Sequence, residues 1–368
     1  MSTHIPYEEL LKFTEEALRK GFGYSEREAR ITARVLAEAD ARGIPSHGVA
    51  RLAFYRKNLE QGYARPGTEP EVVWSTPSSL VVDGHGGVGC YVSEFCVEKM
   101  LGLAEKTGLA FCAVRNSNHY GIAGYWAELA AKKDMIGMAF TNSYLSATPT
   151  FGRRRCLGTN PIAVAVPEGD GRSFLLDMAT TTVAHGKIEL YDRRKKPMPL
   201  GWVIDEEGQG VTDATSFEKT FHQSTLGGHL FVGGEGEENG GHKGFGLGLL
   251  VELLCSGLSL GTASFATYNY NPNKQAGICH FFGALRLDLF GPPEELKKHL
   301  AGIIEVIRSG EKVPGHDRIF IHGEKEDESR ETAMREGVFL DAATRDYLAT
   351  LADEFAIQKP ESLARGAA

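Results

Sequence analysis

The sequence lacks any stretch that combines the length and the apolarity of a transmembrane helix. Its first residues, MSTHIPYEELLKFTEE, contain no apolar segment followed by a cleavage site, so they do not resemble a secretory signal. Internal repeats are also missing. From these absences we expect a cytoplasmic protein without a membrane partner.

Paired-cysteine motifs are absent as well. Six cysteines are spread along the chain without C-x-x-C spacing, which argues against a disulfide scaffold or a zinc knuckle and favours buried free thiols. There is no excess of basic charge, because 40 basic residues stand against 48 acidic ones and the net charge is -8. The short basic clusters RRR and DRRKK have acidic neighbours, so we expect no nucleic-acid partner.

The 368 residues are 42% hydrophobic, which is enough to bury a sizeable core in two or three domains. Helical periodicity dominates the start of the chain, where Ser25 and Glu28 form a capping-box pattern before an apolar stripe. We predict three parts: a helical N-terminal part (1–75), a central α/β part that binds cofactor and substrate (76–289), and a helical C-terminal part that packs on the first (290–368).

Short apolar runs alternate with helical ones in the central part, as in LAFCAV, MIGMAF, IAVAVP and SFLLDM, which predicts an α/β arrangement. The segment HKGFGLGLLVELLCSGLSLG is apolar nearly all round, so we expect a helix packed on all sides at the centre of the molecule. The acidic stretch GEKEDESRE near the C-terminus is expected to be a solvated connection between helices.

Gly84, Gly86 and Gly89 have the G-x-G-x-x-G spacing of a dinucleotide fingerprint. An apolar run precedes them and a helical pattern follows, as a fingerprint requires. The acidic residue expected at the end of the next strand is missing, because LAFCAV runs into Arg115 and Asn116. The residues alone leave two readings open: a fingerprint, or a glycine-rich structural turn between a strand and a buried helix.

The stretch GIPSHGVARL contains a more specific candidate for a catalytic site than the glycine motif does. Ser46, His47 and Arg51 offer within one loop and helix start a hydroxyl, an imidazole for proton transfer and a guanidinium that can hold a carboxylate. A lone histidine more often has a structural role, but the arginine one turn further on favours catalysis here.

Several motifs in order, from ARGIPSHGVARL through VRNSNHYGIAGY, LGTNPIAVAVP, FLLDMATTTVAHGKI and HKGFGLGLLVELL to REGVFL, resemble those of the malate/L-lactate dehydrogenase family. This resemblance runs through nearly the whole chain. It implies a mixed α/β (α+β) fold in which a non-Rossmann NAD(P)-binding sheet domain packs against a helical domain built from both chain ends. It also implies a homodimer, and it makes the glycine motif a structural turn.

The resemblance implies hydride transfer between NAD, or NADP, and a small 2-hydroxy acid or 2-oxo acid of the malate or lactate type. His47 would carry the proton at the substrate oxygen, Ser46 would orient it, and Arg51 would hold the carboxylate. His119 is a second candidate for the proton carrier. The alternatives are a reductase of ureidoglycolate, sulfolactate, a diketo sugar acid or a cyclic imine, the last disfavoured by Lys187, and a non-catalytic dinucleotide-binding protein.

Further site residues follow from the same motifs. The substrate-side candidates are Thr159, Asn160, His185 and Gly186. The cofactor-side candidates are Asn118, His119, Tyr120, Gly121, Asp177, Met178, Ala179, His242, Lys243 and Gly315. A capped turn is the structural alternative at Thr159 and Asn160. Zinc binding is the rival for His242, but no partner stands at ligand spacing, so we predict no metal. The sequence departs from the family pattern at His316, where a glutamate is usual after PG.

Overall fold

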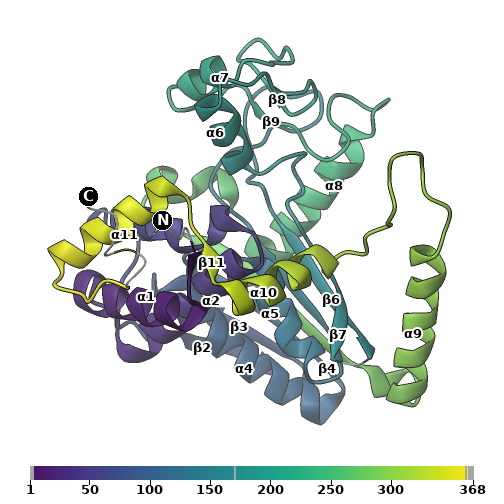
Figure 1. The fold of residues 1–368 in the computed structure, drawn as a ribbon. Coiled ribbons are helices and arrows are strands. Elements are labelled where there is room, and N and C mark those ends of the chain that lie inside the picture. Colours follow the sequence, from purple (N-terminus) through teal and green to yellow (C-terminus); the bar gives the residue numbers. More distant parts are fainter. Residues whose placement is uncertain (1–3, 170, 361–362, 364–368) are drawn as a thin grey trace.

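A mixed seven-stranded sheet forms the centre of the computed structural model, which describes residues 4–169, 171–360 and 363 (Figure 1). Its strands lie in the order β2-β3-β4-β10-β5-β6-β7. Their bounds are Glu71–Thr76 (β2), Ser79–Asp83 (β3), Leu109–Ser117 (β4), Met135–Thr141 (β5), Ile162–Gly169 (β6), Arg172–Met178 (β7) and Ile278–Arg286 (β10). The four runs predicted as strands are confirmed as β4 to β7.

Only β3 and β4 pair in parallel, and the connection between them is α4 (Gly89–Thr107). The other pairs are antiparallel, including β10 with both β4 and β5. The helices α4 and α5 (Ala123–Ala131) pack against the sheet and against each other. The prediction of a mixed α/β fold is therefore confirmed, although most neighbouring strands run antiparallel.

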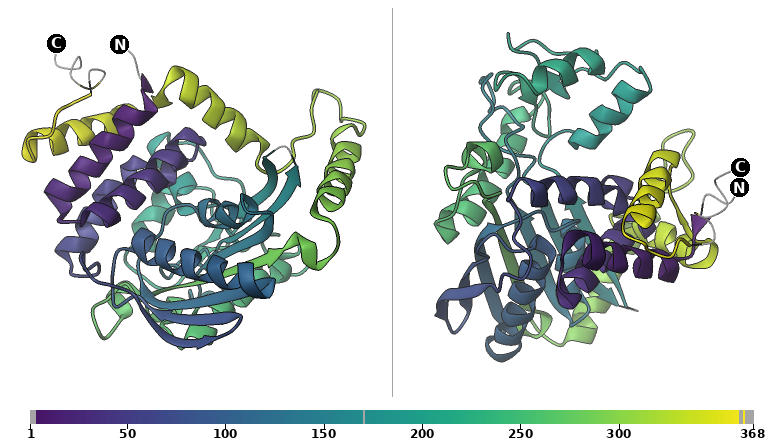
Figure 2. Two further views of the ribbon diagram at one scale, coloured as in Figure 1. Left: turned by 90° about the horizontal axis from the view of Figure 1, so that it is seen from below. Right: turned by 90° about the vertical axis from the view of Figure 1, so that its left-hand side faces the viewer.

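Helices from the two chain ends lie side by side at one end of the molecule (Figure 2). They are α1 (Tyr7–Phe22), α2 (Glu26–Ala41), α3 (Leu52–Glu60), α10 (Glu324–Glu336) and α11 (Ala342–Glu354), whereas α9 (Pro293–Arg308) lies apart from them and packs against β6. The short strands β1 (His4–Ile5) and β11 (Val338–Phe339) pair antiparallel and join the two ends. At the start of α2 the predicted capping box is present, because Ser25 and Glu28 exchange hydrogen bonds.

The acidic stretch predicted to be a solvated connection is instead helix α10, so that prediction was wrong. One side of α10 packs on α2, where Ser329 Oγ donates to the Ala41 carbonyl at 3.0 Å and Arg330 pairs with Glu38 at 2.8 Å. Ala333 is buried at the same contact. The high charge of the segment hid this helix, because only one narrow face of it is buried.

A smaller lobe rises from the sheet at the top of Figure 1. We define the lobe as residues 145–157 and 182–231, two segments joined by backbone pairing. It holds α6 (His185–Arg193), β8 (Val203–Ile204), α7 (Ala214–Phe221) and β9 (Gly228–His229). Its own apolar cluster includes Ile188, Trp202 and Phe217. The sequence-based division into 1–75, 76–289 and 290–368 stays a prediction, and this lobe lies within its central part.

The glycine-rich helix predicted to be packed on all sides is α8 (Gly241–Glu252), continued by a π-helical turn over Leu253–Gly257. Val251 and Cys255 pack toward the sheet, but Leu250 and Leu253 are 48% and 57% exposed. The prediction was wrong for a single chain, because one sheet covers only one side of a helix.

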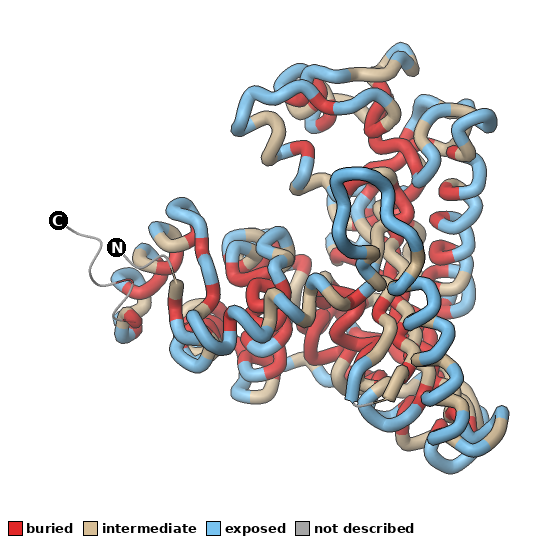
Figure 3. Tube along the Cα trace, turned by 45° about the vertical axis from the view of Figure 1, so that its right-hand side comes forward, coloured by how far each residue is buried: buried red, intermediate tan, exposed pale blue. Residues whose placement is uncertain are grey.

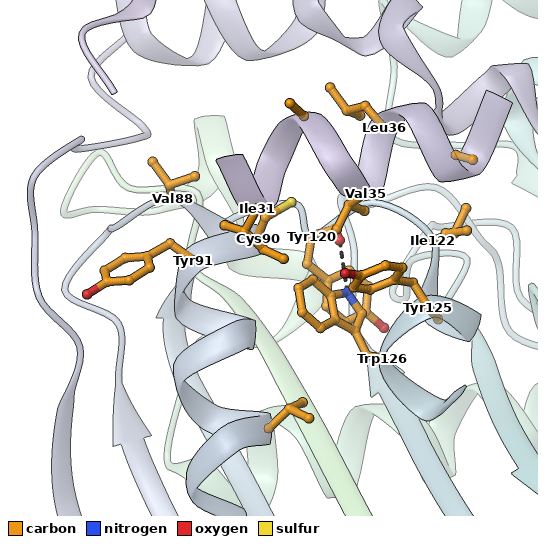
Figure 4. Packing of buried hydrophobic residues seen from close by; sticks show 14 of the residues in the cluster. Ile31, Val35, Leu36, Val88, Cys90, Tyr91, Tyr120, Ile122, Tyr125 and Trp126 are labelled. Carbon is orange, nitrogen blue, oxygen red and sulfur yellow. Dashed lines mark hydrogen bonds between the residues drawn. The ribbon is translucent and has the colours of Figure 1, made fainter. Parts of the chain in front are cut away.

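Buried positions gather where the sheet meets the helices of both chain ends (Figure 3). In this main core, Val35 of α2 lies over Tyr120 and Trp126, and the Trp126 indole donates to the Tyr120 carbonyl at 3.0 Å (Figure 4). All six cysteines are free, and all except the half-buried Cys156 are buried, as predicted. Among the described residues, no helix is long and apolar enough to cross a membrane. Short 3-10 helices complete the fold at Pro45–His47, Val49–Arg51, Ser264–Ala266, Tyr268–Tyr270 and Leu287–Leu289.

Candidate active site

Two cavities meet beside the lobe, one of about 110 Å³ and one of about 700 Å³. Arg51, Tyr144 and Tyr268 line both, so the two cavities adjoin each other. The wall of the smaller cavity brings together many of the residues predicted from sequence, namely Ser46, His47, Arg51, His119, Tyr120, Gly121, Thr159, His185 and Gly186.

The glycine motif lies outside both cavities and has a packing role. A Cβ atom at Gly89 would lie 2.3 Å from the carbonyl oxygens of Asn118 and His119, so the start of α4 needs glycine for close approach to this backbone. The Asn118 amide donates to the carbonyls of Gly86 and Gly87 at 3.0 and 2.9 Å. Asn118 therefore holds the turn in place and lines neither of these two cavities, and its place beside the cofactor stays a prediction.

Local contacts lock the loop that carries Ser46 and His47. The Asp40 carboxylate accepts a hydrogen bond from the Val49 N–H at 2.7 Å. A Cβ atom at Gly48 would lie 1.9 Å from the Asp40 carboxylate, so only glycine fits at the last position of the SHG motif. The residues of this motif thus specify the loop conformation through contacts with the end of α2.

His47 lies between a hydroxyl and a positive charge. Its Nδ1 is 3.0 Å from Ser46 Oγ. Arg51 donates from Nε to the Ser46 carbonyl at 2.5 Å, which leaves the far end of the guanidinium for a ligand. Burial, aided by the charge of Arg51, lowers the pKa of His47 to about 4. His47 is therefore neutral near pH 7 in the free protein and can accept a proton.

His119 stacks on His47, with ring centroids 5.5 Å apart. Its Nδ1 accepts from the Gly121 N–H at 3.3 Å and lies 2.9 Å from the Tyr55 hydroxyl. A backbone N–H can only donate, so the neutral His119 ring carries its hydrogen on Nε2. Burial lowers the pKa of His119 well below the usual value, and the charge of His47 when protonated and the charge of Arg51 add to this effect.

A third histidine, His280 on the central strand β10, lies behind this pair. Its two ring nitrogens are each 2.8 Å from a hydroxyl, of Thr141 and of Ser117. The ring stacks on Tyr120 with centroids 4.4 Å apart, and burial lowers its pKa to about 3. Sequence reasoning missed His280, although a histidine within the apolar run ICHFFGALR was the available signal. Tyr120 itself is buried, and its hydroxyl has no partner among the described residues.

Thr159 and Asn160 are adjacent in sequence but have different surroundings. Thr159 lines the smaller cavity, and its N–H donates to Ser143 Oγ at 2.9 Å. Asn160 is fully buried and donates to Glu252 Oε2 at 2.9 Å and to the Gly248 carbonyl at 3.0 Å. Asn160 therefore ties the loop to α8 and does not reach the cavity.

The remaining cofactor candidates lie outside the cavity wall. Asp177 is exposed at the end of β7, and its Oδ2 accepts from the Gly124 N–H at 2.7 Å. Met178 and Ala179 follow it, half-buried. His242 and Lys243 are exposed in the first turn of α8. Gly315 lies in the exposed loop between α9 and α10 and lines neither cavity.

The lobe side of the cavity holds a second histidine cluster. His185 Nδ1 is 3.1 Å from His229 Nε2, and His185 Nε2 is 3.5 Å from Glu218. His222 Nε2 also lies 3.5 Å from Glu218. One ligand atom from each of His185, Glu218 and His222 falls within 4.8 Å of the others, so these residues could hold a metal ion. Ion pairing with Glu218 explains the same arrangement without a metal.

Several cavity residues escaped the sequence-based prediction. They are Phe54, Tyr144, Arg155 and Tyr268. None of them belongs to a motif with a recognisable mechanism, so the sequence carried no local signal for them.

Comparison with known proteins agrees with this geometry. The family model described as malate/L-lactate dehydrogenase matches residues 5–349. A malate dehydrogenase of Pyrococcus abyssi is 43% identical over 91% of this chain and 90% of its own length. An L-sulfolactate dehydrogenase of Methanocaldococcus jannaschii is 34% identical over 92% and 93%. The crystal structure of malate dehydrogenase from Entamoeba histolytica, 30% identical, covers 97% of this chain and 99% of its own with a TM-score of 0.93.

The fold and these comparisons together define an oxidoreductase. The chain belongs to the malate/L-lactate dehydrogenase family, whose members are dehydrogenases that use a nicotinamide cofactor.

Proposed function

We propose that the protein interconverts a small 2-hydroxy acid and its 2-oxo acid, with malate or lactate as the default substrate type. The stacked pair His47 and His119, beside Arg51 in one cavity, carries this proposal. Oxidation of an alcohol carbon requires a base for the hydroxyl proton and a fixed carboxylate to orient the carbon. When bound, the nicotinamide accepts or supplies the hydride.

His47 is proposed as the proton carrier, with Ser46 holding its Nδ1 side at 3.0 Å. Arg51 holds the substrate carboxylate with the free edge of its guanidinium. That carboxylate offsets the positive charge which helps to lower the pKa of His47, so substrate binding makes His47 a better base. His119 is the second candidate, and its neutral form presents an Nε2–H donor.

The residues of this chain fit a nicotinamide dinucleotide. The unpartnered Tyr120 hydroxyl lies in the buried wall of the smaller cavity. Thr159 of that wall accepts at its carbonyl from the Thr180 N–H at 2.9 Å, and Thr180 adjoins Gly248 of α8. These buried contacts connect the cavity wall to α8, whose first turn carries His242 and Lys243. There the helix N-terminus, His242 and Lys243 favour phosphate groups.

NAD is proposed as the cofactor, with NADP as the alternative. Asp177 supports NAD, because an exposed carboxylate accepts hydrogen bonds from ribose hydroxyls and repels a 2′-phosphate. Reduction of a cyclic imine stays the alternative reaction. Lys187, which disfavoured it in the sequence, has its ammonium 5.2 Å from the Trp202 ring and lines neither cavity, so this residue does not decide between the two reactions.

A panel of 2-oxo acids and one cyclic imine carboxylate, each with NADH and with NADPH, tests the proposal at the nicotinamide absorbance. We expect turnover of a 2-oxo acid, faster with NADH. Turnover of the imine alone would replace the proposed substrate class, and no turnover of any 2-oxo acid would refute it.

The proposal includes a homodimer in the cytoplasm. The exposed apolar face of α8 and its continuation supports association, since Leu250, Leu253 and Leu260 are 48%, 57% and 84% exposed. Sedimentation velocity should show a dimer that Leu253→Glu dissociates. Leu200→Glu, at an exposed leucine of the lobe, is the matched control and should stay dimeric.

A further inference from the structure

Arg155 is a buried guanidinium without a carboxylate partner. The residue is 6% exposed, and burial lowers its pKa. Among the described residues, no carboxylate forms an ion pair with it within 4.0 Å. A buried charge is costly unless it is paired.

The lobe holds this side chain in a fixed position. Arg155 Nη2 donates to the Phe221 carbonyl at 2.9 Å, and the guanidinium carbon lies 4.1 Å from the centre of the Phe221 ring. Gly228 leaves room for the stem, because a Cβ atom there would lie 2.7 Å from Arg155 Cγ. Arg155 Nε is buried and has no acceptor. The contacts therefore orient the guanidinium and leave part of its donor capacity unused.

Arg42 shows how a buried arginine is satisfied elsewhere in the same molecule. It is 7% exposed and donates to both oxygens of Glu128, at 3.0 and 2.7 Å, so its charge is paired although its Nε, like that of Arg155, has no acceptor within the described chain. Arg155 is equally buried but lacks such a partner. An anion bound in the cavity that Arg155 borders would supply such a partner.

The position of Arg155 indicates which anion fits. Arg155 and Arg51 line the same cavity of about 700 Å³, together with Tyr144. Burial raises the pKa of Tyr144, and the positive charges of Arg51 and Arg155 both oppose this rise. Both guanidinium groups are thus within electrostatic reach of one phenol. The cavity offers two anion-binding groups to a single small molecule.

We propose that Arg155 binds the second acid group, a carboxylate or a sulfonate, of a dianionic substrate whose 1-carboxylate lies on Arg51. This inference rests on the proposed function and selects the substrate class within it. A substrate with a methyl group in place of the second acid leaves Arg155 buried and unpaired, so the site favours dianions over monoanions.

Steady-state kinetics of Arg155→Met with oxaloacetate, sulfopyruvate and pyruvate test the proposal. Loss of one partner of a buried charge pair should lower kcat/KM for the preferred dianion by at least about thirtyfold. For pyruvate we expect a change of less than about threefold. Whichever of oxaloacetate and sulfopyruvate loses more identifies the acid group. Equal losses for pyruvate and for both dianions, or no loss, would overturn the proposal.

Arg154→Met is the matched control. Arg154 is the exposed neighbour and donates to Thr225 Oγ1 at 2.8 Å, so this variant removes one positive charge from the same loop. It should keep the wild-type ratio of kcat/KM values for oxaloacetate and pyruvate. A loss of preference equal to that of Arg155→Met would show a general charge effect and contradict the assigned contact.

A binding measurement separates this site from the proposed reaction. Succinate has two carboxylates and butyrate has one, and neither can react. Succinate should raise the unfolding midpoint of the wild type more than butyrate does, and Arg155→Met should lose that difference. This result would support the site even if no 2-oxo acid were turned over. Equal stabilisation of wild type and Arg155→Met by succinate would contradict it.

Discussion

The central sheet with its covering helices (the scaffold) and the lobe differ in how a buried arginine is paired, as Arg42 and Arg155 show. In the scaffold, Arg42 has a bidentate contact with Glu128 that joins α2 to α5. In the lobe, Arg155 has no carboxylate partner and borders the cavity. In the proposed function, the scaffold side presents His47 and Arg51 to the reacting end of the substrate, while the lobe side presents Arg155 to its other end. The difference indicates that buried charge is structural where it is paired and functional where it is not.

The largest effect is expected at the scaffold wall of the cavity. His47→Gln should lower kcat by roughly 10² to 10⁴, the usual contribution of a positioned general acid or base. Cofactor affinity, measured by nucleotide fluorescence titration, should stay unchanged. His119→Gln is the comparison, and if it abolished turnover while His47→Gln stayed active, the two roles would be reversed.

The pH profile gives a second readout of the same prediction. Burial and Arg51 lower the pKa of His47 to about 4, so the base is lost only as pH falls toward that value. For hydroxy-acid oxidation, kcat/KM should stay level down to about pH 5 and then decline, whereas an ordinary histidine would titrate near pH 6.5. Asp40→Asn is the control, because burial raises the pKa of Asp40, beside the same loop, to about 7. A decline of kcat/KM near pH 7 that disappears in this variant would belong to Asp40 and not to His47.

Removing the paired arginine of the scaffold tests the comparison directly. Arg42→Met leaves the buried Glu128 with only the exposed Lys132 as a partner, at 3.7 Å, which should cost about 3–5 kcal/mol of unfolding free energy. Arg155→Met leaves no buried carboxylate behind, so its cost should be clearly smaller. Denaturant titration of both variants measures the two values, and equal losses would remove the distinction between the two regions.

A smaller effect is expected for Arg51→Lys. Lysine keeps the charge but loses the planar fork, so carboxylate orientation should suffer. We expect KM to rise by about tenfold, a change of about 1.4 kcal/mol, while cofactor affinity is retained. A fall in kcat alone, with KM unchanged, would assign Arg51 to the chemical step instead.

Gly84→Ala should affect stability and leave cofactor binding intact. A Cβ atom there would lie 3.0 Å from the Asn116 carbonyl and 3.1 Å from Val92, so the turn must shift slightly. The expected cost is about 1–3 kcal/mol of unfolding free energy. A large rise in the cofactor dissociation constant of the folded variant would restore the fingerprint reading of the glycine motif.

The smallest effect is expected from metal removal. Proton transfer by histidine needs no metal ion, so dialysis against EDTA should leave turnover unchanged. The relevant place in the lobe is the cluster of His185, Glu218 and His222. Loss of activity with EDTA and recovery with zinc would show that this cluster takes part in the reaction.

Local sequence was enough to predict the parts that depend on near neighbours. The capping box at Ser25 and Glu28, the strands β4 to β7 and the grouping of Ser46, His47 and Arg51 involve residues a few positions apart. Their apolar periodicity and spacing therefore carry the signal. The order of the motifs also indicated the family, and with it the place of His119 and Thr159 at the same cavity.

Only the tertiary structure decided what lies between distant segments. Strand β10 enters the sheet between β4 and β5 and brings His280 behind the site, a pairing set by burial and register over more than a hundred residues. Asn118 and Asn160 belong to motifs from which we predicted positions at the site. In the structure, the Asn118 amide donates to a backbone carbonyl and the Asn160 amide donates to Glu252. Of the three arginines in RRR, only Arg155 is buried, because the lobe folds Phe221 against it and leaves the other two in solvent.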